Sequence, residues 1–305
     1  MLSRLVLVAL VAEFAAIAAL DAWLSARLGW PMPASLAFLV LLPLGTRFGL
    51  VCLTSLIAWF ARSPRPPALQ IGPVATIRML LVEYRAMLTD NFWLLPFPGL
   101  ALRPDPPPTR GGPMPVLAVH GYFSNRAILR DVTLALEKAG QGPVHAVTLD
   151  SVLAGIDTVA GLLEREIDAL LEATGHEKLI LVCHSMGGLA ARRMMRGRLR
   201  KRIAKVITIA SPHHGTVLAR IGIGSNARQM RAGGDWIGRL AGEEAGHWPC
   251  PVTSIWSVHD NLVAPQETSR LEGARNIALA GLGHVAILFA PDVHRLVVEE
   301  VRLAR

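Results

Sequence analysis

The 305-residue sequence contains only three cysteines, Cys52, Cys183 and Cys250. Their number is odd, and their spacing matches neither a disulfide framework nor a zinc-binding pattern. Two adjacent histidines, His213 and His214, cannot converge on one metal ion from a regular element, so we predict no zinc site. The cysteines therefore argue against a disulfide-rich or zinc-dependent protein, and they leave the redox compartment open.

Aromatic residues are also scarce, at 6% of the chain. No recognition-helix, RRM or zinc-finger pattern accompanies the net charge of +8, so we expect no nucleic-acid partner. The excess of arginine has two interpretations: a solvated basic surface, or attraction to anionic lipid headgroups. The arginine-rich run 192–202 follows a predicted helix, and we interpret it as a solvated face that complements the helix dipole, with lipid contact as the alternative.

Hydrophobic residues, by contrast, make up 52% of the chain. Two apolar runs, 5–20 and 36–60, each approach the roughly 20 residues needed to cross a bilayer, and glycine and prolines separate them. We therefore predict that residues 1–62 form a hydrophobic helical hairpin that anchors the protein in a membrane. The alternatives are a cleavable signal peptide and two helices packed on the soluble part of the chain.

Each apolar run contains one charged residue near its middle, Glu13 in the first and Arg47 in the second. Because lone charges are costly inside a bilayer, we expect these two side chains to face each other. Arginines before, between and after the runs favour the cytoplasmic side of the membrane for both ends of the hairpin. The large C-terminal part of the chain would then lie in the cytoplasm.

The segment 63–114 connects the hairpin to the rest of the chain. We predict a stiff, proline-rich linker over 96–115. Before it, the spacing of apolar residues predicts an amphipathic helix over 74–95, whose apolar stripe contains Ile77, Leu80, Leu81 and Tyr84.

From residue 115 to 305, short apolar runs alternate with helical patterns. This alternation indicates an α/β domain with a mostly parallel sheet and helices on both faces, in which ligands bind beyond the carboxyl ends of the strands. Strands are expected at 116–120, 144–149, 179–183, 204–210, 252–258 and 276–280. Helices are expected at 126–139, 156–174, 186–196 and, in large part, 285–303.

Ser185 lies in a Cys-His-Ser-Met-Gly-Gly corner between a predicted strand and a predicted helix. A sharp turn there would hold the serine hydroxyl clear of the backbone, near the positive end of the helix dipole. The pattern resembles Gly-x-Ser-x-Gly, with Cys183 in place of the first glycine. Serine is a poor nucleophile unless a histidine takes its proton and a carboxylate steadies the histidine.

His284 is the best candidate for the base, because it lies in a glycine-flanked loop directly after the last predicted strand. Asp260 follows a predicted strand and falls between Ser185 and His284, which is the chain order expected in this kind of fold. Asp235 falls in the same interval without a strand before it, so we prefer Asp260.

Acyl transfer also requires donors for the oxygen that becomes negative. We expect the backbone N–H groups of Met186, directly after the serine, and of Tyr122, in the loop after the first strand, to form this oxyanion hole. Gly121 would allow the backbone of that loop to turn.

Five motifs in this order resemble those of bacterial lipases and esterases of the α/β-hydrolase superfamily. They are HGY at 120–122, HSMGG at 184–188, IASPHHGT at 209–216, the segment 257–265 and GLGH at 281–284. The resemblance spans residues 115–305 and implies a minimal α/β-hydrolase domain with a Ser185–Asp260–His284 triad. It further implies hydrolysis of carboxylic esters, in particular of acyl lipids, through an acyl-enzyme. With the predicted hairpin, we expect the protein in the bacterial inner membrane.

The resemblance also suggests where substrate and cofactors would bind. Phe123, His184, Pro212 and Trp236 are expected to contact the substrate. The segment 217–248 lies where such hydrolases have a cap, with a packed surface helix as the alternative. Some lipases of the family hold calcium near the acid and base loops, but no carboxylate cluster here identifies a site, so calcium stays unassigned and no cofactor is expected.

The same triad would also serve a thioesterase, an amidase or an acyltransferase. A non-catalytic membrane binding protein built on a hydrolase scaffold is a further alternative, although the complete triad argues against it.

Overall fold

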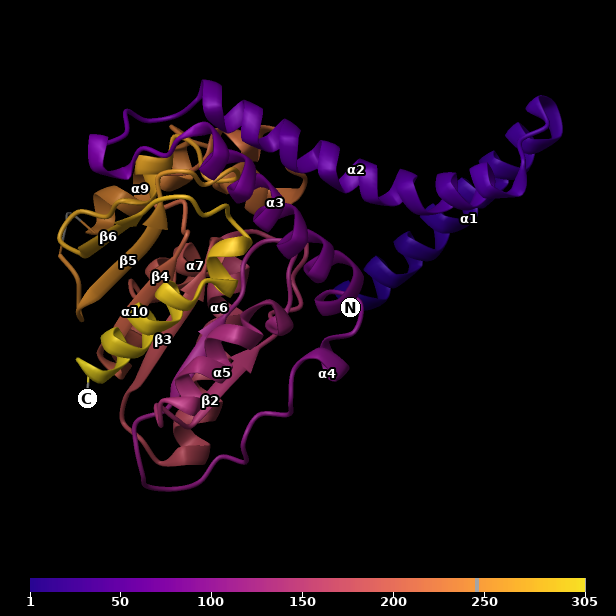
Figure 1. The fold of residues 1–305 in the computed structure, drawn as a ribbon. Coiled ribbons are helices and arrows are strands. Elements are labelled where there is room, and N and C mark those ends of the chain that lie inside the picture. Colours follow the sequence, from indigo (N-terminus) through magenta and orange to yellow (C-terminus); the bar gives the residue numbers. More distant parts are fainter. Residues whose placement is uncertain (245–246, 305) are drawn as a thin grey trace.

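The computed structural model describes residues 1–244 and 247–304. Within them, six strands form one parallel sheet in the order β2-β1-β3-β4-β5-β6 (Figure 1). The strands are β1 (Val116–Val119), β2 (Val144–Val147), β3 (Leu179–His184), β4 (Ile203–Ile209), β5 (Val252–Ser257) and β6 (Arg275–Leu279). All six predicted strands are thus confirmed.

Helices cover both faces of this sheet, as the predicted α/β architecture requires. On one face, Leu117 and Val119 of β1 pack in a core with α6 (Ile156–Thr174) and α7 (Met186–Met194). On the other face, the alternate residues of β1 pack with α5 (Arg130–Lys138) and α10 (Pro291–Arg302). Because both faces are buried, the strands read as continuous apolar runs in the sequence.

Two of the predicted helices begin later than expected. A 3₁₀ turn, Arg126–Leu129, precedes α5, and another, Ala286–Phe289, precedes α10. Proline fixes its own φ and has no N–H to donate, so Pro291 is accommodated at the start of α10 and not inside a longer helix.

The N-terminal hairpin consists of α1 (Leu2–Leu28) and α2 (Met32–Phe60), and the turn between them contains Gly29 at φ 64°. Both helices are long and apolar enough to cross a membrane. Both guanidinium NH groups of Arg47 donate to the Glu13 carboxylate, which confirms the expected pairing of the two charges. In Figure 1 the two helices cross and project together away from the sheet.

The predicted amphipathic helix after the hairpin is present as α3 (Pro73–Thr89). Of its predicted apolar stripe, Ile77 and Leu81 are 59% and 53% exposed, whereas the Tyr84 ring packs against Phe48 of α2. The buried face contains Glu83, Ala86 and Met87, and it packs on the loop that precedes α10. That loop has backbone N–H groups that need hydrogen-bond acceptors. A carboxylate can accept these hydrogen bonds, whereas an apolar side chain cannot. A short helix, α4 (Pro98–Ala101), interrupts the predicted linker near its start.

The cap-like segment 217–248 contains a 3₁₀ turn and two short helices, α8 (Gly224–Gln229) and α9 (Asp235–Glu244). Ile237 and Leu240 of α9 are buried, and Ile237 packs in the core beside α7, as in a packed surface helix. Ile221 and Ile223, between the 3₁₀ turn and α8, are 70% and 60% exposed. Residues 245 and 246 of the predicted cap lie outside the described residues.

Arg192 corrects the interpretation of the run 192–202 as a solvated face. Its side chain is 1% exposed, and its Nε donates to Glu244 Oε1 at 2.9 Å. A buried guanidinium needs hydrogen-bond acceptors. Arg192 is therefore buried on the side of α7 where Glu244 of α9 can accept from it.

Candidate active site

Ser185 occupies the turn between β3 and α7 in a strained conformation, with φ 53° and ψ −126°. Its backbone N–H donates to the Ile209 carbonyl at 2.9 Å, which fastens the turn to the end of β4. A Cβ at Gly187 would lie 2.7 Å from the His120 carbonyl oxygen, so this position requires glycine. A Cβ at Gly121 would lie 2.7 Å from the Ser185 Cβ. The glycines of these two motifs therefore allow the loop after β1 to approach the serine closely.

Cys183, which replaces the first glycine of the serine pattern, is fully buried. It packs in the core between the sheet and α6 and α7, away from the tight part of the turn. Burial raises the pKa of its thiol. Cys183 is therefore an apolar core residue and not a nucleophile.

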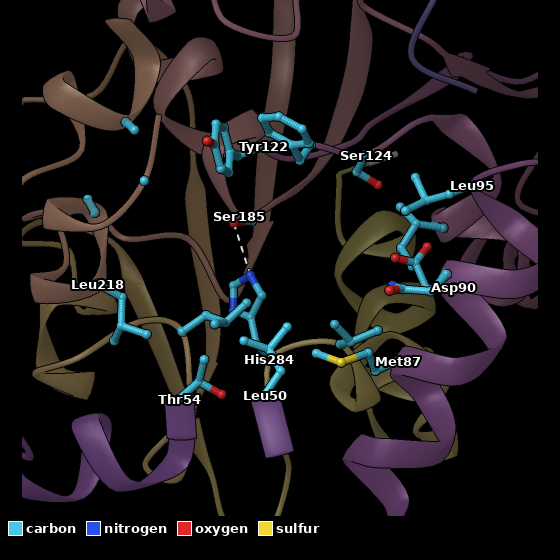
Figure 2. Close-up of a pocket in the computed structure, with 18 of the residues that line it drawn as sticks. Leu50, Thr54, Met87, Asp90, Leu95, Tyr122, Ser124, Ser185, Leu218 and His284 are labelled. Atoms are coloured by element: carbon cyan, nitrogen blue, oxygen red, sulfur yellow. Dashed lines mark hydrogen bonds between the residues drawn. The ribbon is translucent and has the colours of Figure 1, made fainter. Parts of the chain in front are cut away.

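The three predicted triad residues lie together at the carboxyl ends of their strands. His284 Nε2 is 3.0 Å from Ser185 Oγ, and His284 Nδ1 is 2.8 Å from Asp260 Oδ2. The backbone N–H groups of Leu262 and Val263 donate to Asp260 Oδ1 at 2.8 and 2.7 Å. These bonds hold the carboxylate in place behind the imidazole, which Figure 2 shows joined to Ser185.

The environment of His284 suits a base that must accept a proton. Burial alone would lower the pKa of this imidazole, but the Asp260 carboxylate outweighs burial and raises it, with Glu83 adding to the rise. The neighbouring His184 is different, because burial and the nearby His284 hold its pKa well below the ordinary value. Of these two adjacent histidines, only His284 has a carboxylate partner.

The two N–H donors of the predicted oxyanion hole are free to bind a ligand. The backbone N–H groups of Tyr122 and Met186 donate to no acceptor within the described part of the chain. His120 shapes the Tyr122 loop, because its Nε2 accepts from Leu149 N–H at 3.0 Å and its Nδ1 therefore donates to the Gly121 carbonyl at 2.8 Å. The Tyr122 hydroxyl donates to the Ile223 carbonyl at 2.8 Å and so ties this loop to the cap-like segment.

A cavity of about 570 Å³ opens beside Ser185 and His284. Of the predicted substrate-binding residues, Phe123, His184 and Pro212 line it. Trp236 is not among its lining residues; its indole N–H donates to Asp157, in the first turn of α6, at 2.8 Å. Figure 2 shows Tyr122, Ser185 and His284 facing the cavity, with Met87, Asp90 and Leu95 on the opposite wall.

Glu83 of α3 is a site residue that the sequence did not identify. Its carboxylate accepts from the backbone N–H of Ala286 at 2.8 Å and of Val285 at 3.1 Å, directly after His284 in the chain. It is 1% exposed, and burial raises its pKa. No sequence motif marks this glutamate, because its hydrogen-bond partners are backbone groups about 200 positions later in the chain.

Replacing Glu83 tests whether this contact positions His284. In Glu83→Leu we expect a loss of stability of about 1–3 kcal/mol for each N–H left unpaired, together with a lower kcat. In Glu83→Gln one amide oxygen can still accept, so stability should change less. Because the Glu83 charge raises the pKa of His284, the acid limb of kcat/KM should still move to lower pH in Glu83→Gln. The matched control is Glu137→Gln, at an exposed position on α5, and an unmoved limb in Glu83→Gln would contradict the assignment.

Comparisons with known proteins agree with this architecture. A family described as a PGAP1-like alpha/beta domain matches residues 155–226. The chain is 30% identical over 127 residues to lysosomal thioesterase PPT2 of Rattus norvegicus, which is 40% of this chain and 41% of that protein. Human lysosomal thioesterase PPT2 is 29% identical over the same length. The chain thus spans about two fifths of the length of these curated relatives.

Solved structures extend the comparison to about two thirds of the chain. Lipase B of Aspergillus fumigatus superposes with a TM-score of 0.57 at 19% identity, covering 63% of this chain and 53% of that chain. The mature lipase BlEst2 of Bacillus licheniformis superposes with a TM-score of 0.56 at 15% identity, covering 66% of this chain and 95% of that chain. The chain has the α/β-hydrolase fold, preceded by two long apolar helices.

Proposed function

We propose that this protein is a membrane-associated serine hydrolase that cleaves the carboxylic esters of acyl lipids. The observation that carries the proposal is the continuous chain of contacts from Ser185 through His284 to Asp260, at the mouth of a largely apolar cavity. The lipase-like fold and the thioesterase relatives support an acyl hydrolase. The ester linkage and the lipid are our inference.

In the proposed reaction, Ser185 Oγ attacks the ester carbonyl carbon while its proton passes to His284 Nε2. The carbonyl oxygen becomes negative and accepts from the N–H groups of Tyr122 and Met186. His284 then gives its proton to the leaving alcohol, and an acyl-enzyme remains on Ser185. Water, activated by the same imidazole, releases the fatty acid and restores the serine.

The hairpin supports a lipid as the substrate, because it forms part of the cavity. The lining residues of α1 are Val6, Ala9, Leu10 and Glu13, and those of α2 are Arg47, Leu50 and Thr54. Their spacing places each set on one helix face, turned toward the active site. A lipid could therefore pass from a bilayer into the cavity along these faces. The arginines that flank the hairpin support a catalytic domain on the cytoplasmic side of a bacterial inner membrane.

A thioesterase is the second candidate, and the PPT2 relatives favour it. The same triad would attack a thioester carbonyl in the same way, so the two functions differ in the leaving group. Comparing hydrolysis of an acyl ester and an acyl thioester of equal chain length would rank them.

The test of the proposed function uses the full-length protein in detergent micelles. We expect a fluorophosphonate probe to label Ser185, as located by peptide mapping, and p-nitrophenyl esters of long acyl chains to be hydrolysed faster than short ones. Absence of both labelling and hydrolysis would favour a non-catalytic scaffold. Labelling with a preference for short chains would indicate an esterase of small substrates.

A further inference from the structure

The cavity wall that faces the triad carries polar side chains that the proposed reaction does not use. Asp90 begins a single π-helical turn, Asp90–Leu94, directly after α3. Such turns are rare and frequently occur at functional sites. Asp90 lines the cavity, and Figure 2 shows it across the space from His284.

The carboxyl group of Asp90 has an unused oxygen. The residue is 9% exposed, and its Oδ1 has no hydrogen-bond partner among the residues the structure describes. Buried polar atoms are nearly always paired. Burial raises the pKa of Asp90 to about 7. A hydrogen bond from the Asn91 side chain opposes this rise, and the nearby Glu83 adds to it. Near neutral pH the group can therefore both accept and donate a hydrogen bond.

The neighbouring charges restrict what Asp90 can bind. Arg47 also lines the cavity, but its guanidinium is paired with Glu13. An anionic phosphate or carboxylate would meet Asp90 and Glu13 with no unpaired guanidinium among the described residues that line the cavity to offset them. A hydroxyl group carries no charge and both donates and accepts, so it matches a carboxyl group that exists in both protonation states.

We propose that Asp90 binds a hydroxyl group of the substrate, located away from the scissile ester, so that the cavity selects hydroxylated acyl esters. The inference rests on the proposed function and adds to it a second polar subsite. The hydroxyl can come from the alcohol part of the ester, as in a monoacylglycerol, or from the far end of the acyl chain.

Two matched pairs of esters distinguish these sources. We compare monododecanoylglycerol with propyl dodecanoate, and the ω-hydroxy derivative of methyl dodecanoate with methyl dodecanoate itself, using the full-length protein in micelles. In one pair the hydroxyl should raise kcat/KM by about 10- to 100-fold, as expected for one hydrogen bond to an ionisable group. In Asp90→Leu this advantage should disappear.

The matched control is Met87→Leu, which changes the same cavity wall without changing its polarity. It should keep the hydroxyl advantage. The proposal would be overturned if the hydroxyl gave no advantage in either pair, or if its advantage persisted in Asp90→Leu. A larger gain from an ω-amino ester than from the hydroxy ester would also overturn it. Unchanged fluorophosphonate labelling of Ser185 in Asp90→Leu shows that the variant is folded.

A binding measurement separates this proposal from the proposed function. If the hydroxyl comes from the alcohol part, dodecylglycerol ether should raise the Tm of the wild type more than dodecyl propyl ether does. If it comes from the acyl chain, 1,12-dodecanediol should raise the Tm more than dodecanol does. Asp90→Leu should remove the difference. Ethers and alcohols are not hydrolysed, so this result does not depend on catalysis. Equal shifts in wild type and Asp90→Leu for both pairs would overturn the subsite even if ester hydrolysis is observed.

Discussion

Replacing Ser185 with alanine is expected to lower kcat by about a million-fold for any ester that the protein hydrolyses. The loss is large because, in the proposed reaction, the hydroxyl forms the covalent intermediate, and without it the remaining groups can only stabilise the slow attack of water. Alanine keeps the Cβ and adopts the same backbone conformation at φ 53° as readily as serine does. The variant should therefore fold like the wild type, and the rate is measured by release of p-nitrophenol from a long-chain ester.

Ser211→Ala is the matched control for this experiment. Ser211 is fully buried near the start of the nucleophile helix, and its hydroxyl has no partner within the described residues. Removing it takes away the same atom without touching the triad, so activity should stay near that of the wild type. Comparable activity in Ser185→Ala and Ser211→Ala would show that Ser185 is not the nucleophile.

Much of the hydrolase domain was predictable because its signals are local. A strand that is buried on both faces is a continuous apolar run, and the turn at Ser185 needs small residues such as Gly187 within two positions. The order of serine, acid and base in the chain then limits the acid to the interval between Ser185 and His284, and the strand before Asp260 selects it over Asp235. These predictions depend on residues close together in the sequence and on the general rules of the fold. They do not depend on contacts between residues far apart in the sequence.

The contribution of the N-terminal segments was not predictable in the same way. Apolar periodicity predicts an apolar stripe on α3 that includes Ile77 and Leu81, but it does not predict that the helix buries Glu83 while these two apolar side chains stay exposed. A buried carboxylate is stable only because its oxygens meet backbone donors from the loop after His284. Nothing near Glu83 in the sequence indicates this loop. Arg192 was misjudged for the same reason, because its partner Glu244 lies on another helix.

Replacing Asp260 with asparagine is expected to lower kcat by about ten-thousand-fold, through the tautomer of His284. The carbonyl oxygen of the introduced amide would keep the bonds from Leu262 and Val263, so the NH₂ of that amide would face His284 Nδ1. Nδ1 would then accept a hydrogen bond, and the ring proton would move to Nε2. An imidazole with its proton on Nε2 cannot take the proton of Ser185.

The pH dependence of kcat/KM checks this explanation independently of the rate loss. His284 works as a base only when neutral, and its raised pKa means that activity is lost, as pH falls, at a higher pH than for an ordinary imidazole. The Asp260 charge causes most of this rise, so the acid limb in Asp260→Asn should move to lower pH. Asp292→Asn, whose carboxylate is exposed and paired with Arg295, is the control and should leave the limb in place. A limb that stays in place in Asp260→Asn would mean that Asp260 does not set the protonation of His284.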